Sequence, residues 1–474
     1  MGEERLHVAL LPWLAFGHMI PFLHLAVALA AAGLRVSFLS TPRNNRRLPK
    51  IPPHLTSLIT FVDLPLPPID GLPDQAEATV DIPEDKVPLL KNACDLLQDP
   101  FKDFLAQKSP DFLLHDFFHH WAVAAAHDVG VPSVFFVVFS ATATAFSGPP
   151  EALMEDGGKK SWPSPESMTS PPEWLPSGST VAFRRREAEL LYLSAFAMTS
   201  MGLTDVDRMR LAVEGCAALA VRSCREYEGE YLDVVRRIFR KPVIPVGLLP
   251  PPPPPPTGGD RDDNWGRIFG WLDDQPPKSV VFVSFGSEYK LTESEVHELA
   301  YGLELSNVPF LWALRRPSWA SGSDEEALPE GFQTRTEGRG VVSFGWAPQL
   351  EILAHPSIGG SLFHSGWGSI IETLGYGHAL VVMPNIIDQG LNARLLVEKG
   401  IAVEVERGDD DCFHRNEIAK ALQMAMVSSE GEGLRRKARE TATVFADRDL
   451  HDKYIKEFVD YLLKTRNNQS IEGN

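Results

Sequence analysis

The chain has 474 residues, of which 44% are hydrophobic and 23% are charged, a length and composition typical of a globular protein with two cores. Its 45 basic residues are outnumbered by 63 acidic residues, so the formal net charge is −18. That balance argues against binding to nucleic acid, since phosphate contacts need a basic face.

The first forty residues predict a strand, a helix and a second strand. Residues 6–12 form an apolar run, residues 17–32 have a helical pattern that ends at Gly33, and residues 35–40 form another apolar run. This order is typical of a βαβ unit with parallel strands. Similar strand patterns at residues 112–115, 134–139 and 243–247 extend the series.

No signal peptide or membrane span is expected. The first residues carry charges of both signs and lead directly into a strand. The uncharged window 129–148 contains Gly130 and Pro132 and a β-rich stretch, which favours a buried strand followed by a helix. The four cysteines lack metal-binding spacing and favour free thiols, and we expect a cytoplasmic protein.

A proline run divides the chain. Residues 250–256 are all proline and are followed by Thr-Gly-Gly-Asp, a composition that forms neither a helix nor a central strand. We therefore expect one α/β domain over residues 1–247, a linker over 248–264 and a second α/β domain over 265–450. The remaining segment, 451–474, begins with a helical stripe of apolar residues.

The most informative stretch runs from residue 346 to residue 389. It contains the motifs Trp346-Ala-Pro-Gln349 and His364-Ser-Gly-Trp-Gly-Ser369, then Glu372, then Asp388-Gln389. The motif that begins at His364 follows an apolar run at 358–363, and Asp388-Gln389 comes shortly after another at 379–383. Open α/β sheets bind ligands at the carboxyl ends of such strands. The segment after His364 also opens a helix, whose free N–H groups suit a diphosphate. Together these groups suit a nucleoside diphosphate sugar.

These motifs resemble the nucleotide-sugar signature of plant UDP-dependent glycosyltransferases, and the resemblance extends over essentially the whole chain. It implies a GT-B fold, in which two doubly wound, Rossmann-like α/β domains face each other across a cleft. It also implies that the first domain binds the acceptor, that the second binds the UDP-sugar, and that the helix within 451–474 returns to the first domain.

The resemblance assigns roles to individual residues. It implies that Trp346 and Ala347 hold the uracil, Gln349 and Glu372 the ribose, His364, Ser369 and Ser287 the phosphates, and Asp388, Gln389 and Ser140 the sugar. Trp367 and Gly368 belong to the same phosphate-binding motif. Gly368 replaces the family's usual asparagine and can offer only its backbone N–H, and Ala379 stands where the family usually has proline.

His18 is the candidate general base. It follows the first strand, and Asp116 directly follows the strand at 112–115, so both belong to the same sheet edge. A lone histidine is more often structural, but a carboxylate beside it can hold its tautomer and stabilise the imidazolium. The family's His and Asp dyad matches these positions. The mechanism implied is one in-line displacement with inversion, in which the base takes the acceptor's proton.

No metal is expected in this reaction. The Asp-x-Asp pairs that bind metals in other glycosyltransferases occur here at residues 205–207, 409–411 and 447–449. None of them follows a buried strand, and Thr204-Asp-Val-Asp has the pattern of a helix cap.

The segments 116–122 and 286–288 resemble the branch of the family that adds sugars to existing glycosides. The candidate acceptor-binding residues are Trp13, Phe16, Phe117, His119, Phe139, Phe146, Met198 and Glu288. We expect about half of the aromatic residues among them to belong to the core instead.

The sequence therefore predicts an inverting, metal-independent transfer of glucose from UDP-glucose to a sugar hydroxyl of a terpenoid or flavonoid glycoside, with β-1,2 branching as one product. We expect a monomer without a permanently bound cofactor. UDP-rhamnose and UDP-xylose stay open as donors, and the alternative from another class is a noncatalytic protein that binds nucleotide sugars or glycosides.

Overall fold

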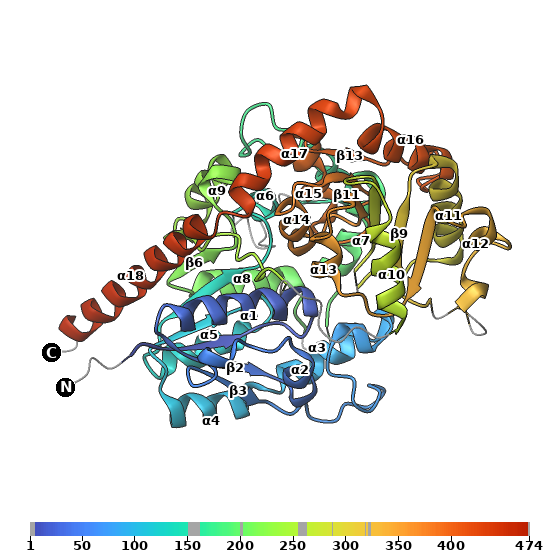
Figure 1. Ribbon diagram of the computed structural model, residues 1–474. Helices are drawn as coiled ribbons and strands as arrows, with labels where there is room; N and C mark the ends of the chain where they lie inside the picture. The colour runs from blue at the N-terminus through green and yellow to red at the C-terminus, as the bar shows by residue number, and fades with distance from the viewer. Residues whose placement is uncertain are drawn as a thin grey trace. The chain divides into compact units, whose positions relative to one another are not determined.

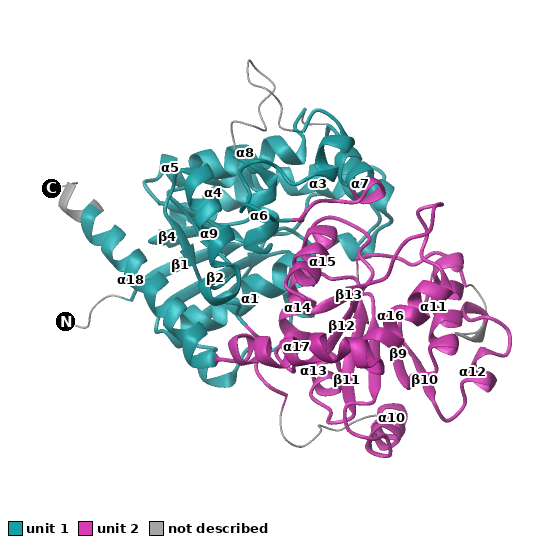
Figure 2. Ribbon diagram, turned by 90° about the horizontal axis from the view of Figure 1, so that it is seen from above, with its two compact units in different colours: residues 1–179, 188–249, 448–474 teal, residues 180–187, 250–447 magenta. Residues whose placement is uncertain are grey.

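The computed structural model describes residues 5–149, 162–199, 202–254, 263–286, 288–317, 319–320 and 324–472. The chain divides into two compact units, each built around a parallel sheet (Figures 1 and 2). Unit 1 comprises residues 1–179, 188–249 and 448–474, and unit 2 comprises residues 180–187 and 250–447. Two doubly wound α/β domains agree with the predicted fold class.

Unit 1 contains a seven-stranded sheet with the order β3-β2-β1-β4-β5-β6-β7, and all its strand pairs are parallel. Its strands are β1 His7–Leu11, β2 Arg35–Ser40, β3 Ile59–Asp63, β4 Phe112–His115, β5 Ser133–Val137, β6 Ala218–Val221 and β7 Val243–Pro245. Most of these strands are short apolar runs, because helices cover both faces of such a sheet.

The helices of this unit are α1 Phe16–Ala31, α2 Pro42–Arg47, α3 Val87–Asp95, α4 Gln98–Lys108, α5 His120–Asp128, α6 Ala141–Ser147, α8 Asp205–Gly215, α9 Arg225–Phe239 and α18 Arg448–Glu472. Helix α7, Arg185–Ala195, begins in unit 2 and continues in unit 1. The short 3-10 helices of unit 1 are Pro53–Leu55, Thr79–Asp81, Glu84–Lys86 and Pro165–Thr169.

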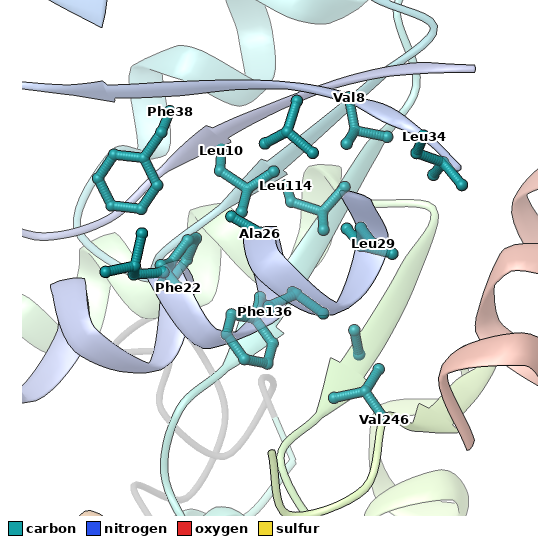
Figure 3. Close-up of a cluster of buried hydrophobic side chains, with 14 of the residues drawn as sticks. Val8, Leu10, Phe22, Ala26, Leu29, Leu34, Phe38, Leu114, Phe136 and Val246 are labelled. Carbon is teal, nitrogen blue, oxygen red and sulfur yellow. The ribbon is translucent and has the colours of Figure 1, made fainter. Parts of the chain in front are cut away.

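The larger core of unit 1 lies between the sheet and helices α1 and α18. In Figure 3, Phe22, Ala26 and Leu29 of α1 point toward the strand residues Leu10 and Leu114, and all five are buried. Helix α18 adds apolar side chains to the same cluster. The C-terminal helix therefore contributes to the core of the first unit.

Unit 2 contains a six-stranded parallel sheet with the order β10-β9-β8-β11-β12-β13. Its strands are β8 Val280–Ser284, β9 Phe310–Leu314, β10 Gly340–Phe344, β11 Ile358–Phe363, β12 Ala379–Val382 and β13 Ala402–Glu404. Its helices are α10 Asp263–Asp273, α11 Glu293–Ser306, α12 Phe332–Arg335, α13 Gln349–Leu353, α14 Trp367–Leu374, α15 Gln389–Glu398, α16 Arg415–Met426 and α17 Glu432–Phe445, with 3-10 helices at Asp324–Ala327 and Ser429–Gly431.

The strand order reverses direction once in each sheet. In unit 1 the reversal lies between β1 and β4, and in unit 2 it lies between β8 and β11. Doubly wound sheets bind ligands just beyond the carboxyl ends of the strands at this switch point. His18 and Asp116 follow β1 and β4, while Glu288 and His364 follow β8 and β11. The candidate residues thus lie where this topology places binding sites.

The compact units differ from the sequence-based division at two places, one of which is residues 448–450, assigned to the second domain but part of unit 1. Residues 180–187, which we assigned to the first domain, belong to unit 2, while residues 188–249 return to unit 1. Within the described ranges, no helix has both the length and the apolar character needed to cross a membrane. The uncharged window 129–148 instead contains the buried strand β5 and helix α6, as predicted.

Candidate active site

His18 and Asp116 form a hydrogen-bonded pair in unit 1. Nδ1 of His18 lies 2.8 Å from Oδ2 of Asp116, and both side chains are buried. The Asp116 carboxylate also accepts hydrogen bonds from the backbone N–H of Trp13 at 3.1 Å and of Phe117 at 2.7 Å. Three donors therefore fix its position, which in turn fixes the plane of the imidazole.

The surroundings of Asp116 keep it ionised. Burial tends to raise the pKa of this carboxyl, but the charge and hydrogen bond of His18, together with the N–H of Trp13, outweigh burial and hold the pKa below its ordinary value. An ionised acceptor at Nδ1 requires a proton on that nitrogen. It leaves Nε2 as the basic atom of the neutral ring.

Aromatic rings pack beside the His18 imidazole. Phe117 lies 5.7 Å away between ring centroids, and Phe139 lies 5.4 Å away in an edge-to-face arrangement. Both phenylalanines are only partly buried. They surround the base with apolar surface, as expected for residues that line a binding site.

Three of the predicted acceptor-binding residues lie inside the core of unit 1. Trp13 packs on Phe118 with 4.1 Å between ring centroids, and Phe146 stacks on Trp162 at 4.8 Å. His119 is fully buried, with Nε2 3.3 Å from Sγ of Cys94, and burial lowers its pKa to about 3. All three side chains pack against neighbouring side chains of unit 1.

The other predicted acceptor-binding residues retain exposed surface. Met198 is 74% exposed, and Phe16 is partly buried beneath the guanidinium of Arg47, which lies 5.0 Å from the ring centroid. Glu288 of unit 2 is also partly buried. Ser140, which was predicted to contact the donor sugar, is by contrast fully buried. Its hydroxyl oxygen caps α6 by accepting a hydrogen bond from the N–H of Ala143 at 3.1 Å.

In unit 2, the first donor motif places an indole in solvent. Trp346 is 90% exposed, which is unusual for the largest apolar side chain and gives it a free ring face. Three residues later, Nε2 of Gln349 donates a 2.6 Å hydrogen bond to Oε2 of Glu372. The amide and carboxylate predicted to hold the ribose are therefore adjacent in the structure.

His364 follows β11 and is enclosed by glycines. A Cβ added to Gly286 would lie 2.9 Å from Cε1 of His364, and one added to Gly366 would lie 2.7 Å from its Nε2. Both glycines therefore allow the backbone to approach the imidazole closely. Burial lowers the pKa of His364 to about 4. Before a ligand binds the ring is therefore neutral at pH 7, and it can offer an N–H to a phosphate.

Helix α14 begins at Trp367, three residues after this histidine. The backbone N–H groups of its first residues, among them Gly368 and Ser369, have no carbonyl one turn earlier in the helix and form an electropositive end. The indole of Trp367 is buried against Phe445, with 6.3 Å between ring centroids, so its side chain serves the core. Ser287 lies outside the described residues.

The predicted sugar-binding pair is held in a tightly bonded turn. The carboxamide oxygen of Gln389 accepts hydrogen bonds from the N–H of Asn385 at 2.9 Å and of Ile386 at 3.1 Å. These two donors fix the orientation of the amide, so its –NH₂ group points away from them. Oδ2 of Asp388 accepts a 2.8 Å hydrogen bond from Nδ2 of Asn392.

Sequence reasoning missed the part that Ser365 and Asn392 play in this turn. The Ser365 hydroxyl donates to the carbonyl oxygen of Gln389 at 2.8 Å, and Nδ2 of Asn392 lies 3.1 Å from the carbonyl oxygen of Ser365. These bonds connect the phosphate motif to the turn at residues 385–389, which we call the sugar turn. The available signal was the serine in place of the family's usual cysteine, because a hydroxyl is the stronger donor.

A small hollow with a volume of about 10 Å³ lies beside the donor motifs, and its lining includes Ser284, Gln349 and Ser369. Across the described ranges, no three side chains of His, Cys, Asp or Glu are grouped as metal ligands. Asp205 instead pairs with Lys91 at 2.6 Å, and Thr204 caps α8 as predicted.

Comparison with known proteins places these motifs in a family. The family model described as UDP-glucoronosyl and UDP-glucosyl transferase matches residues 271–429, and the model described as glycosyltransferase, N-terminal domain matches residues 4–175. UDP-glycosyltransferase 91C1 of Arabidopsis thaliana is 42% identical over 97% of either chain. Soyasaponin III rhamnosyltransferase of Glycine max is 42% identical over 98% of this chain and 97% of its own length.

A solved structure gives the same result for the fold. UGT73P12 of Glycyrrhiza uralensis, crystallised with glycyrrhetinic acid 3-O-monoglucuronide, matches with a TM-score of 0.80 at 22% identity and covers 99% of this chain and 98% of its own. The predicted GT-B fold is thus confirmed. Because the sequence identity extends over nearly the whole chain, the protein is an enzyme of the plant UDP-glycosyltransferase family.

Proposed function

We propose that the protein transfers glucose from UDP-glucose to a sugar hydroxyl of a terpenoid or flavonoid glycoside, with inversion and without a metal. The observation that carries this proposal is the buried pair in which Asp116 holds Nδ1 of His18 at 2.8 Å. A carboxylate that fixes the proton on Nδ1 prepares Nε2 to take a proton from an attacking hydroxyl.

Unit 2 supplies the donor site in this proposal. The exposed face of Trp346 stacks on uracil, and the Gln349 and Glu372 pair binds the ribose hydroxyls. The N-terminus of α14 and the neutral ring of His364 donate hydrogen bonds to the diphosphate. These groups stabilise the charge that develops on UDP as it leaves.

The sugar turn supports a hexose at the end of the donor. Gln389 presents –NH₂ donors, since its carbonyl is already bonded to the turn, and Asp388 presents carboxylate oxygens. Sugar hydroxyls both donate and accept hydrogen bonds, so one donor group and one acceptor group side by side suit them.

A glycoside acceptor is proposed from the resemblance of segments 116–122 and 286–288 to the branch that extends existing glycosides. The rings of Phe117 and Phe139 beside His18 supply apolar surface for a bulky aglycone, and Glu288 supplies a polar group for its sugar. A 1,2-linked branch with β configuration is the product we propose.

Product analysis tests the proposal directly. The enzyme is incubated with UDP-glucose and a library of triterpenoid, diterpenoid and flavonoid glycosides, and products are identified by mass spectrometry and by the anomeric coupling in NMR. We expect a mass gain of one hexose and a β linkage. UDP release that does not depend on any glycoside, or an α-linked product, would be incompatible with the proposal.

UDP-rhamnose is the second candidate donor. It is favoured by the 42% identity to a protein named soyasaponin III rhamnosyltransferase. It is also favoured by Gly368, because the phosphate site then lacks the side chain of the family's usual asparagine. Competition between UDP-glucose, UDP-rhamnose and UDP-xylose for one acceptor separates these donors.

A further inference from the structure

Residues 180–187, which we call the brace segment, lie on helix α15 and strand β13 of unit 2, although the residues on either side of the segment belong to unit 1. At its beginning, the N–H and the hydroxyl of Thr180 donate to Oε2 of Glu398 at 2.7 and 3.1 Å. At its end, Glu187 reaches the opposite end of the same helix, near Gln389. The brace segment therefore runs along α15.

Glu187 accepts several hydrogen bonds at the end of the brace segment. Nη2 of Arg394 lies 3.0 Å from Oε1 and 2.9 Å from Oε2, and Oε2 also accepts from the N–H of Arg184 at 2.9 Å. Arg394 pairs in addition with Glu404, whose other oxygen lies 3.1 Å from Arg184. Glu187 is only 3% exposed, while the side chain of Arg184 keeps 34% of its surface exposed. Two arginines and two glutamates balance their charges here, and Glu187 is the most buried of the four.

The Glu187 carboxylate rests directly on the first turn of α15. A Cβ added to Gly390 would lie 2.3 Å from Oε2 of Glu187 and 3.1 Å from Cδ1 of Phe183. Any side chain at position 390 would displace the carboxylate. Gly390 follows Gln389 in the chain, so Glu187 supports the backbone that carries the sugar-binding pair.

The turn that leads into α15 is strained. Ile387 has φ +56°, a left-handed conformation that β-branched residues avoid. Such a conformation persists only when the surrounding structure imposes it. Ser365 and the side chain of Gln389 constrain the turn from one side, and the brace segment constrains the helix that follows.

We propose that Glu187 is a positioning residue for the donor sugar, and that by resting on Gly390 and pairing with Arg394 it fixes where Asp388 and Gln389 meet the hexose. This inference rests on the proposed function, because it assumes that these two residues bind the sugar of the donor. Glu187 does not touch the donor itself in this proposal.

Glu187→Gln tests the proposal with little change in shape. A carboxamide has one acceptor oxygen and places an –NH₂ group against Arg394 or the Arg184 N–H, so the turn loses its support. We expect the KM for UDP-glucose to rise about tenfold, since small displacements of positioning groups have effects of up to about a hundredfold. The Kd for UDP is expected to stay within about twofold, because uracil, ribose and phosphates bind elsewhere.

The matched control is Glu398→Gln, which removes the charge of the side chain that accepts from Thr180 at the far end of α15. It should leave both constants unchanged. A second variant, Gly390→Ala, displaces the Glu187 carboxylate without altering any charge and should raise the KM for UDP-glucose in the same way. Its control is Gly270→Ala in α10, where an added Cβ meets nothing within 4 Å.

The outcomes separate the possible errors. A tenfold rise in KM with unchanged UDP affinity in both test variants, together with unchanged controls, supports the positioning role. Equal losses of UDP and UDP-glucose affinity would show that Glu187 has only a structural role. A KM for UDP-glucose within twofold of the wild-type value would show that Glu187 does not position the donor sugar. If the wild-type enzyme itself fails to bind UDP or to transfer a hexose, the proposed function is wrong and the variants are not interpreted.

Discussion

Replacing Asp116 with asparagine should abolish the function of His18 as a base while preserving its position. The carboxylate accepts from three N–H groups: Nδ1 of His18, and the backbone N–H groups of Trp13 and Phe117. An asparagine oxygen placed toward Phe117 puts its –NH₂ group against Trp13 and His18. Nδ1 of His18 must then accept a hydrogen bond, and the ring proton moves to Nε2, where the base is needed.

The size of the effect follows from these contacts. A positioned general base contributes about 10²–10⁴ in rate, so we expect kcat to fall roughly 10³-fold, equivalent to about 4 kcal/mol at 1.36 kcal/mol per factor of ten. The N–H of Trp13 loses its acceptor as well, which should lower the free energy of unfolding by about 1–3 kcal/mol. In the proposed function UDP binds to unit 2, so its Kd should not change.

The assay is the kcat for hexose transfer at saturating donor and acceptor, with UDP affinity measured by calorimetry on the same preparation. Asp111→Asn is the matched control, since Asp111 accepts a 2.7 Å hydrogen bond from the N–H of His7 at the opposite end of β1. It should leave kcat unchanged. If Asp116→Asn retains more than about a tenth of the wild-type kcat, the pair is structural and the base lies elsewhere.

Three further predictions concern binding and stability. Trp346→Ala should weaken UDP binding about tenfold in calorimetry, since stacking on a base contributes about 1–3 kcal/mol, with no loss of stability from so exposed a side chain, and an unchanged Kd would place uracil elsewhere. Burial and the charge of Lys278 lower the pKa of His378 to about 3, so as the pH falls below 6.5 the unfolded chain binds a proton that the folded chain does not. Between pH 7.5 and 5.5 the free energy of unfolding in urea should therefore fall by about 1.4 kcal/mol more in the wild type than in His378→Gln. Equal decreases in the two proteins would show that His378 is not the cause. Arg208→Met should cost unit 1 about 3–5 kcal/mol because it leaves the buried carboxylate of Asp95 unpaired, and a smaller loss in the double variant with Asp95→Leu would identify the charge as the reason.

Local sequence patterns were sufficient to predict much of the fold. The apolar runs at 35–40, 112–115 and 358–363 coincide with β2, β4 and β11, because a buried parallel strand must be apolar on both faces. Strand β6, Ala218–Val221, was not predicted. A run of only four apolar residues shows no periodicity that could distinguish a strand from a helix. Its place in the sheet depends on the neighbouring strands.

The candidate site divides in the same way between local and tertiary information. The pairing of His18 with Asp116 follows from their positions after β1 and β4, which the βαβ pattern already indicates. The burial of Trp13 and Phe146 depends on rings distant in the sequence, Phe118 and Trp162, that no local pattern connects to them. The location of the brace segment on α15 depends on contacts spanning about two hundred residues, and a single sequence contains no signal for them.

The bonding of Gln389 gives the two ends of one side chain separate tasks. Its oxygen holds the turn, because it accepts hydrogen bonds from two backbone N–H groups. Its nitrogen is left to donate a hydrogen bond to a ligand. A glutamate at this position could accept from the same two N–H groups, but it would replace the outward –NH₂ donor with a charged acceptor oxygen in a largely buried side chain. In the proposed function, exchanging this single nitrogen for oxygen would invert the hydrogen-bond polarity presented to the hexose, which makes this position a natural point for altering sugar selectivity.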